Sequence, residues 1–198
     1  MGSATNQTAQ NYDTLVFGDT ALGFVELPDG PSQTAPDGTS AGEVPNTVAT
    51  VALPEVAVDQ SMGNFIAQVT TTNIDAKNNL VGFQGDFTFD ERIVTFQSEP
   101  VQKAGLTGSN WNVSGNVVPG DGPVRTLRIS AYSNDFTPLL GSGTLFELRM
   151  TRVNKAAPTT QLIWAPPPDH FIFIDADLKT QKPGNAAPGS VAPSAKRK

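Results

Sequence analysis

The chain has 198 residues, a length that fits one β-rich domain with extensions better than two full domains. Thirteen Lys and Arg against nineteen Asp and Glu give a formal net charge of −6, which argues against a nucleic-acid surface because phosphate binding rests on Lys and Arg. The absence of cysteine excludes disulfides, thiolate metal sites and a cysteine nucleophile.

Residues 1–46 are predicted to be an N-terminal arm followed by a linker. The runs 12–17 and 21–27 are short, apolar and bounded by turn residues, so both are expected to be strands. Residues 28–46 contain almost no apolar anchor and repeat the Pro-Asp-Gly turn signal, which is typical of a linker or a long loop.

Residues 47–181 contain a dense series of strand-like runs separated by Gly, Pro, Asn and Asp. Side chains alternate in the run 80–89, with Phe83, Phe87 and Phe89 on one parity and Gln84, Asp86 and Thr88 on the other. Almost no segment has the 3.6-residue period of a helix. Further runs lie at residues 48–53, 64–70, 125–131, 144–150, 160–164 and 171–175. This pattern predicts an all-β, antiparallel two-sheet sandwich.

Residues 182–198 are rich in Pro, Gly and Ala and are predicted to be a low-complexity tail, disordered or leading to another module. No apolar run approaches the ~20 residues that a membrane helix needs. The opening Met1-Gly2-Ser3 resembles a cloning remnant, and no signal peptide follows it. We expect a mature or excised segment of an exported protein.

Catalytic chemistry is poorly represented in the sequence. His170 is the only histidine and follows a Pro-rich, turn-like stretch without a Gly-x-Ser-x-Gly elbow, so a turn role is expected rather than catalysis. The carboxylate pairs Asp86 with Asp90 and Asp175 with Asp177 could act in glycoside hydrolysis, but a solvated strand face and a strand-end turn are the simpler interpretations. We expect no enzyme activity, no cofactor and no metal site.

Trp111, Trp164 and Tyr132 are the aromatic candidates for stacking against a sugar. A carbohydrate platform needs several aromatic side chains exposed on one face, whereas most aromatic residues here are Phe at core parity. Core packing or a rim position is therefore expected for both tryptophans.

Three blocks of the sequence resemble the cohesin module and related carbohydrate-binding β-sandwiches: residues 80–96, 126–133 and 138–150. Their order and spacing agree with the family, although Glu91 follows Phe89-Asp90 where the family usually has Pro. The resemblance implies a jelly-roll sandwich of about nine strands. It also implies a non-catalytic role, in which the module docks a calcium-binding dockerin of another exported protein at the cell surface or outside the cell.

If the family geometry holds, the outward-facing residues of two strands would form the partner-binding face, unless they are simply an ordinary polar sheet face. The residues are Gln84, Asp86, Thr88, Arg128, Ser130 and Tyr132.

An alternative function is a structural subunit that assembles with other copies of itself into a filament or surface layer. The arm at residues 12–27 could pair with the open sheet edge of a neighbour by strand addition, or it could fold back on its own domain.

Overall fold

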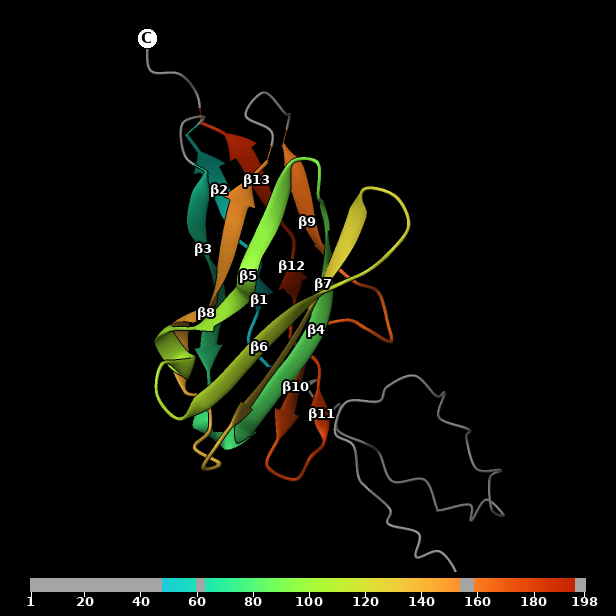
Figure 1. The fold of residues 1–198 in the computed structure, drawn as a ribbon. Helices are drawn as coiled ribbons and strands as arrows, with labels where there is room; N and C mark the ends of the chain where they lie inside the picture. Colours follow the sequence, from blue (N-terminus) through green and yellow to red (C-terminus); the bar gives the residue numbers. More distant parts are fainter. Residues whose placement is uncertain (1–47, 60–62, 154–158, 195–198) are drawn as a thin grey trace, which may run out of the picture. The chain divides into compact units, whose positions relative to one another are not determined.

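The computed structural model describes residues 48–59, 63–153 and 159–194, which form two β-sheets packed on a common core (Figure 1). The predicted arm at residues 12–27, its linker and the basic end at residues 196–198 lie outside the described residues.

The prediction of an all-β sandwich is confirmed, because the described elements are strands and two 3-10 turns. They are β1 (Val51–Ala52), β2 (Glu55–Val58), β3 (Asn64–Ile74), η1 (Ala76–Asn78), β4 (Leu80–Asp90), β5 (Val94–Lys103), η2 (Gly105–Thr107), β6 (Trp111–Val118), β7 (Val124–Ser133), β8 (Gly141–Arg152), β9 (Thr160–Trp164), β10 (Ile172–Asp175), β11 (Thr180–Gln181), β12 (Ala186–Ala187) and β13 (Gly189–Pro193).

The smaller sheet has the strand order β12-β1-β3-β8-β5. Its centre is the antiparallel pair of β3 and β8, whose register runs from Asn64 opposite Thr151 to Ile74 opposite Gly141. Buried and exposed residues alternate along the first six residues of β3, as the period of two in a strand requires. One face of this sheet therefore packs on the core while the other faces solvent.

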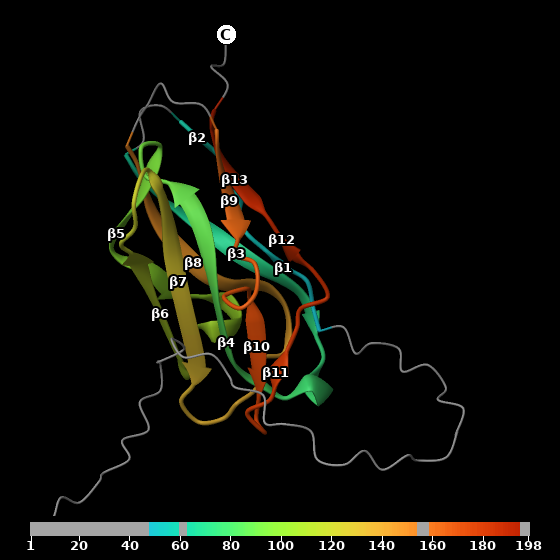
Figure 2. The ribbon, with the colours of Figure 1, turned by 90° about the vertical axis from the view of Figure 1, so that its right-hand side faces the viewer.

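The larger sheet is organised around β4. Strand β7 pairs with one side of β4 over nine residue pairs, and β6 continues the sheet beyond β7. On the other side, β10 pairs with β4 at Gln84 and earlier, whereas β9 pairs with it at Phe87 and Thr88. Strands β9 and β10 thus follow each other along β4 (Figure 2), and the segment between them leaves the sheet near Asp86.

The core is dominated by phenylalanine from the inward parity of β4. The ring of Phe83 stacks on Phe146 with centroids 5.6 Å apart and on Phe171 at 5.7 Å, which joins the two sheets. Trp111 and Trp164 are both buried, with 3% and 9% of their surface exposed. The expectation that the tryptophans pack in the core is confirmed.

The sandwich continues past residue 181, where the sequence predicted it to end. Strand β12 pairs with β1, and β13 lies between β9 and β2, with Val191 fully buried. Small residues allow this close approach, because a Cβ at Gly189 would collide with the Pro54 carbonyl. Pro, Gly and Ala look like linker composition, so composition alone placed residues 182–194 outside the sandwich. Both β12–β1 and β13–β2 are parallel, so the fold is not purely antiparallel.

In the described part of the chain, no helix has the length and apolar character needed to cross a membrane.

Candidate functional site

The six residues predicted for partner binding lie on the outer face of the larger sheet, on β4 and β7. The register places Gln84 opposite Ser130 and Asp86 opposite Arg128, while Tyr132 lies opposite Gly82. Thr88 lies opposite Thr126, and its hydroxyl donates to the Ile163 carbonyl at 3.4 Å. The alternation of side chains along each strand was therefore sufficient to predict that these six residues lie on one face of the sheet.

Asp86 and Arg128 form the ion pair at the centre of this face. Arg128 Nη2 donates to Asp86 Oδ2 at 2.9 Å, and Arg128 Nε lies 3.1 Å from Oδ1. The Asp86 side chain is 7% exposed and that of Arg128 is 50% exposed. A carboxylate at this depth is stable only when it is paired, and the hydrogen bonds to Asp86 in turn raise the pKa of Arg128 above its usual value.

The segment between β9 and β10 forms hydrogen bonds with the backbone of Asp86. The Asp86 N–H donates to the Asp169 carbonyl at 2.9 Å, and the Ala165 N–H donates to the Asp86 carbonyl at 2.8 Å. An Asp169 carboxylate oxygen also lies 3.8 Å from Arg128 Nη2. The neighbouring Gly85 permits this arrangement, since a Cβ there would lie 2.7 Å from the Phe171 Cα.

Strands β6 and β9 extend the same face with residues that the sequence prediction missed. Asn112 lies opposite Tyr132 and donates to its hydroxyl at 3.1 Å, and Ile163 on β9 is 51% exposed. The alternation of polar residues at 112, 114 and 116 was the signal that could have revealed β6. We call this surface the docking face; it comprises Gln84, Asp86, Thr88, Asn112, Ser114, Asn116, Thr126, Arg128, Ser130, Tyr132 and Ile163.

The carboxylates considered for catalysis are held by other partners. Asp90 accepts from Arg92, with Nη2 to Oδ2 at 2.6 Å, and this hydrogen bond lowers the pKa of Asp90. Asp86 is bound by Arg128, so each member of that predicted pair has its own arginine. The two carboxylates of this pair are therefore bound by different arginines and share no hydrogen-bond partner among the described residues.

Asp175 shapes the turn between β10 and β11. Its Oδ1 accepts from the N–H groups of Asp177 and Lys179, at 3.0 and 2.9 Å. Hydrogen bonding, led by the Gln181 side chain, lowers the pKa of Asp175. In the ranges that the structure describes, no group of three acidic or histidine residues converges as a metal site.

His170 lies in the segment that joins β9 to β10. Both of its ring nitrogens are buried, and neither has a hydrogen-bond partner among the described residues. A catalytic histidine needs one nitrogen held by an orienting group and the other directed at a nucleophile. The surroundings of His170 supply neither contact.

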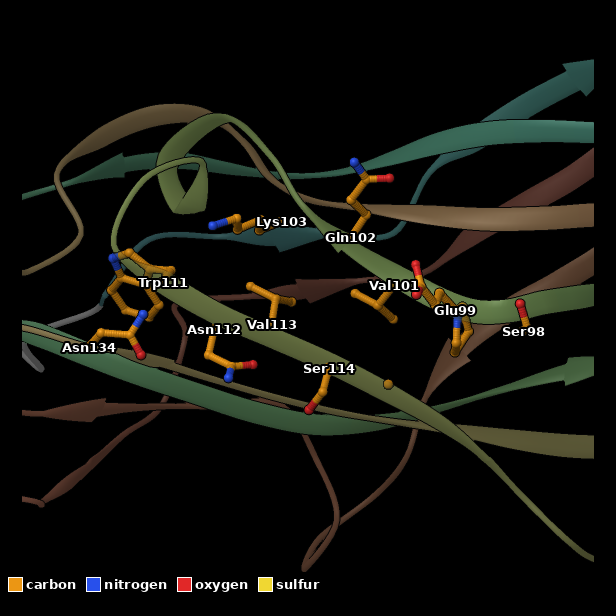
Figure 3. Close-up of a pocket in the computed structure, with 12 residues that line it drawn as sticks. Ser98, Glu99, Val101, Gln102, Lys103, Trp111, Asn112, Val113, Ser114 and Asn134 are labelled. Atoms are coloured by element: carbon orange, nitrogen blue, oxygen red, sulfur yellow. The ribbon is translucent and has the colours of Figure 1, made fainter.

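An open cleft of about 560 Å³ runs along the seam between β5 and β6 (Figure 3). Glu99, Val101 and Gln102 come from β5, and Asn112 and Ser114 from β6. Trp111 also borders the cleft, but its burial leaves no flat aromatic surface for a sugar ring.

The fold of this two-sheet sandwich is similar to that of cohesin modules. The chain is similar to a non-cellulosomal cohesin from Archaeoglobus fulgidus, with a TM-score of 0.55 and 13% identity over 75% of this chain and 93% of the other. It is similar to the sixth cohesin of scaffoldin B from Acetivibrio cellulolyticus, solved with a Cel5 dockerin, with a TM-score of 0.56 and 14% identity over 74% and 99%.

A third similar structure is the cohesin module of a family 33 glycoside hydrolase from Clostridium perfringens. The TM-score is 0.56 and the identity 12%, over 76% of this chain and the whole of that one. No family model and no curated protein matches the sequence. The likeness establishes the fold, and the predicted cohesin-like architecture is confirmed.

Proposed function

We propose that this protein is a non-catalytic attachment module that binds a dockerin-type partner through the docking face. The observation that carries the proposal is the Asp86–Arg128 pair, which is fixed by the sheet register and by the segment between β9 and β10. It leaves half of the Arg128 side chain exposed beside Ser130 and Tyr132. A pre-ordered arginine loses less conformational freedom on binding than a mobile one.

The exposed side chains suit a protein partner. Tyr132 and Ile163 are 53% and 51% exposed and supply apolar area on either side of the polar centre. Tyrosine and arginine are enriched among residues that dominate binding energy. A sheet face is also more rigid than a loop, which favours a specific and reversible interface.

The dockerin class of partner is supported by the similar structures. One of them, the scaffoldin B cohesin from Acetivibrio cellulolyticus, was solved in complex with a dockerin. Dockerins are calcium-binding modules, so attachment should require calcium on the partner's side. An exported or cell-surface location follows from the same proposal.

The test is a binding measurement against purified dockerin modules and against the exported proteins of the parent organism, with calcium and with chelator. Tyr132→Ala should weaken a calcium-dependent interaction about tenfold, because it removes a large exposed side chain from the face. Ile66→Ala is the matched control, since Ile66 is 57% exposed but lies on the outer side of the smaller sheet. Equal losses in both variants would refute the assignment of the face.

A further inference from the structure

Strand β6 is an unusually unprotected sheet edge. It pairs with β7 from Trp111 opposite Ser133 to Val118 opposite Thr126, and with no other strand that the structure describes. Its eight residues include no charged side chain and no proline. Natural proteins commonly place such residues on long edges to prevent pairing with another chain.

The other described edges are protected or short. Strand β5 carries Glu99, Pro100 and Lys103, and its register breaks between Phe96 and Val101. Strand β2 has four residues, and β11 and β12 have two each. The contrast indicates that β6 is open for pairing in a way that its counterparts are not.

The inner row of β6 is incompletely covered. Trp111, Val113, Gly115 and Val117 share the core-facing parity, yet burial falls along the row: Trp111 is buried, Val113 is half-buried and Val117 is 41% exposed. The cleft beside β5 in Figure 3 opens along the same edge. An added strand would cover the apolar side chains that the seam leaves in water.

We propose that β6 pairs antiparallel with β6 of a second copy of this chain, around a two-fold axis at Gly115. Facing residues of an antiparallel pair share one side of the sheet, so the axis must pass through a residue and not between two. With Gly115 on the axis, Val113 faces Val117 of the second copy, and Ser114 faces Asn116. This register pairs seven of the eight residues.

The strand is complementary to itself in this register. The dimer contains two Val113–Val117 pairs on the core side of the joined sheet. Each pair covers Val117, which is 41% exposed in the single chain. The outer side brings hydroxyl and amide groups together. Because β6 has no charge, two chains with a net charge of −6 would meet along a neutral strip. These features make a second copy the partner that fits the edge, in an isologous dimer.

The first test is the mass in solution by light scattering over a concentration series. The wild-type mass should rise toward twice the 20.9 kDa of one chain. Val117→Lys should weaken dimerisation about tenfold by removing both valine pairs and placing a charge at the edge. Leu178→Lys adds the same charge at a turn residue that is 66% exposed, and should leave the dimer intact. Circular dichroism checks that both variants fold.

Cross-linking tests the register without disturbing the inner row. The chain has no cysteine, so a disulfide can form only at introduced positions. Mild oxidation of Ser114→Cys mixed with Asn116→Cys should give a covalent heterodimer, whereas each variant alone should give little.

Three results would overturn the proposal. One is a wild-type protein that stays monomeric at every concentration. Another is a Val117→Lys variant that dimerises as well as Leu178→Lys. The third is a dimer that depends on residues 1–46 and not on Val117, which would transfer self-association to the arm. Dockerin binding is measured in parallel on Val117→Lys, whose side chain lies on the inner row of β6 and outside the docking face, so that loss of the dimer and loss of dockerin binding are separate readouts.

Discussion

Each outer face of the sandwich carries an arginine–carboxylate pair that joins neighbouring strands, and the two pairs differ in burial. On the larger sheet, the Asp86 side chain is 7% exposed and its partner Arg128 is 50% exposed. On the smaller sheet, Arg149 and Glu99 are 33% and 80% exposed, at 3.2 Å. Beside the larger-sheet pair, the segment between β9 and β10 forms hydrogen bonds with the Asp86 backbone and brings Asp169 to 3.8 Å from Arg128. The pair on the larger sheet is therefore tied to a distant segment as well as to its own two strands.

The largest expected effect comes from forcing that segment away from the larger sheet. Gly85→Ala would place a Cβ 2.7 Å from the Phe171 Cα, so the backbone must move. We expect a loss of about 3 kcal/mol in the free energy of unfolding, measured by urea denaturation. Gly63→Ala, just before β3 of the smaller sheet, is the control, because its Cβ would meet nothing within 4 Å. Equal stabilities for the two variants would show that the segment between β9 and β10 is loosely held.

A smaller effect is expected from the two arginines. Arg128→Ala leaves a buried carboxylate without its partner and should cost about 2 kcal/mol of stability. Arg149→Ala removes an exposed pair and should change stability by no more than about 0.5 kcal/mol. The same denaturation series measures both. If Arg149→Ala proved as costly as Arg128→Ala, burial would not explain the contrast between the faces.

The smallest effect is expected where β7 of the larger sheet leads into β8 of the smaller one. Hydrogen bonds from the Thr137 backbone and side chain, and then from Asn110, lower the pKa of Asp135 from 3.8 to about 2. A carboxylate whose folded pKa is depressed contributes fully above its unfolded pKa, and the contribution disappears as the pH falls through the folded value. Asp135→Asn should therefore unfold more readily than wild type at pH 6, and the difference should vanish near pH 2. A difference that persisted unchanged at pH 2 would contradict the assignment to this carboxylate.

The alternation of side chains predicted most of the strands and the side of the sheet on which their residues lie. The run at residues 80–89 became β4, and both phenylalanine and polar sets lie on the predicted sides. The alternation of side chains could not show, however, which distant segments of the chain contact a sheet face. Asp86 is on the outer parity and yet buried, and its N–H donates to the carbonyl of Asp169, a residue more than eighty positions later in the chain.

The C-terminal strands escaped prediction for a different reason. Residues 186–193 contain no long apolar run, and their place in the sheets depends on small side chains that fit between strands already present. What determines the position of β13 is the gap between β9 and β2, and the sequence of the segment itself does not reveal that gap. The break between β9 and β10, by contrast, was predicted, because three prolines at residues 166–168 separate the runs at 160–164 and 171–175 and a strand could not continue through them.

The placement of β13 also has a consequence for the order of events during synthesis. Strand β2, among the first residues of the sandwich to be made, pairs with β13 alone among the described strands, at residues 190–193. At the usual elongation rate, β2 waits on the order of ten seconds for its neighbour to be translated. Its long-range pairing also carries the entropic penalty of a very distant contact. The sandwich can therefore reach its native form only after residues 190–193 have left the ribosome.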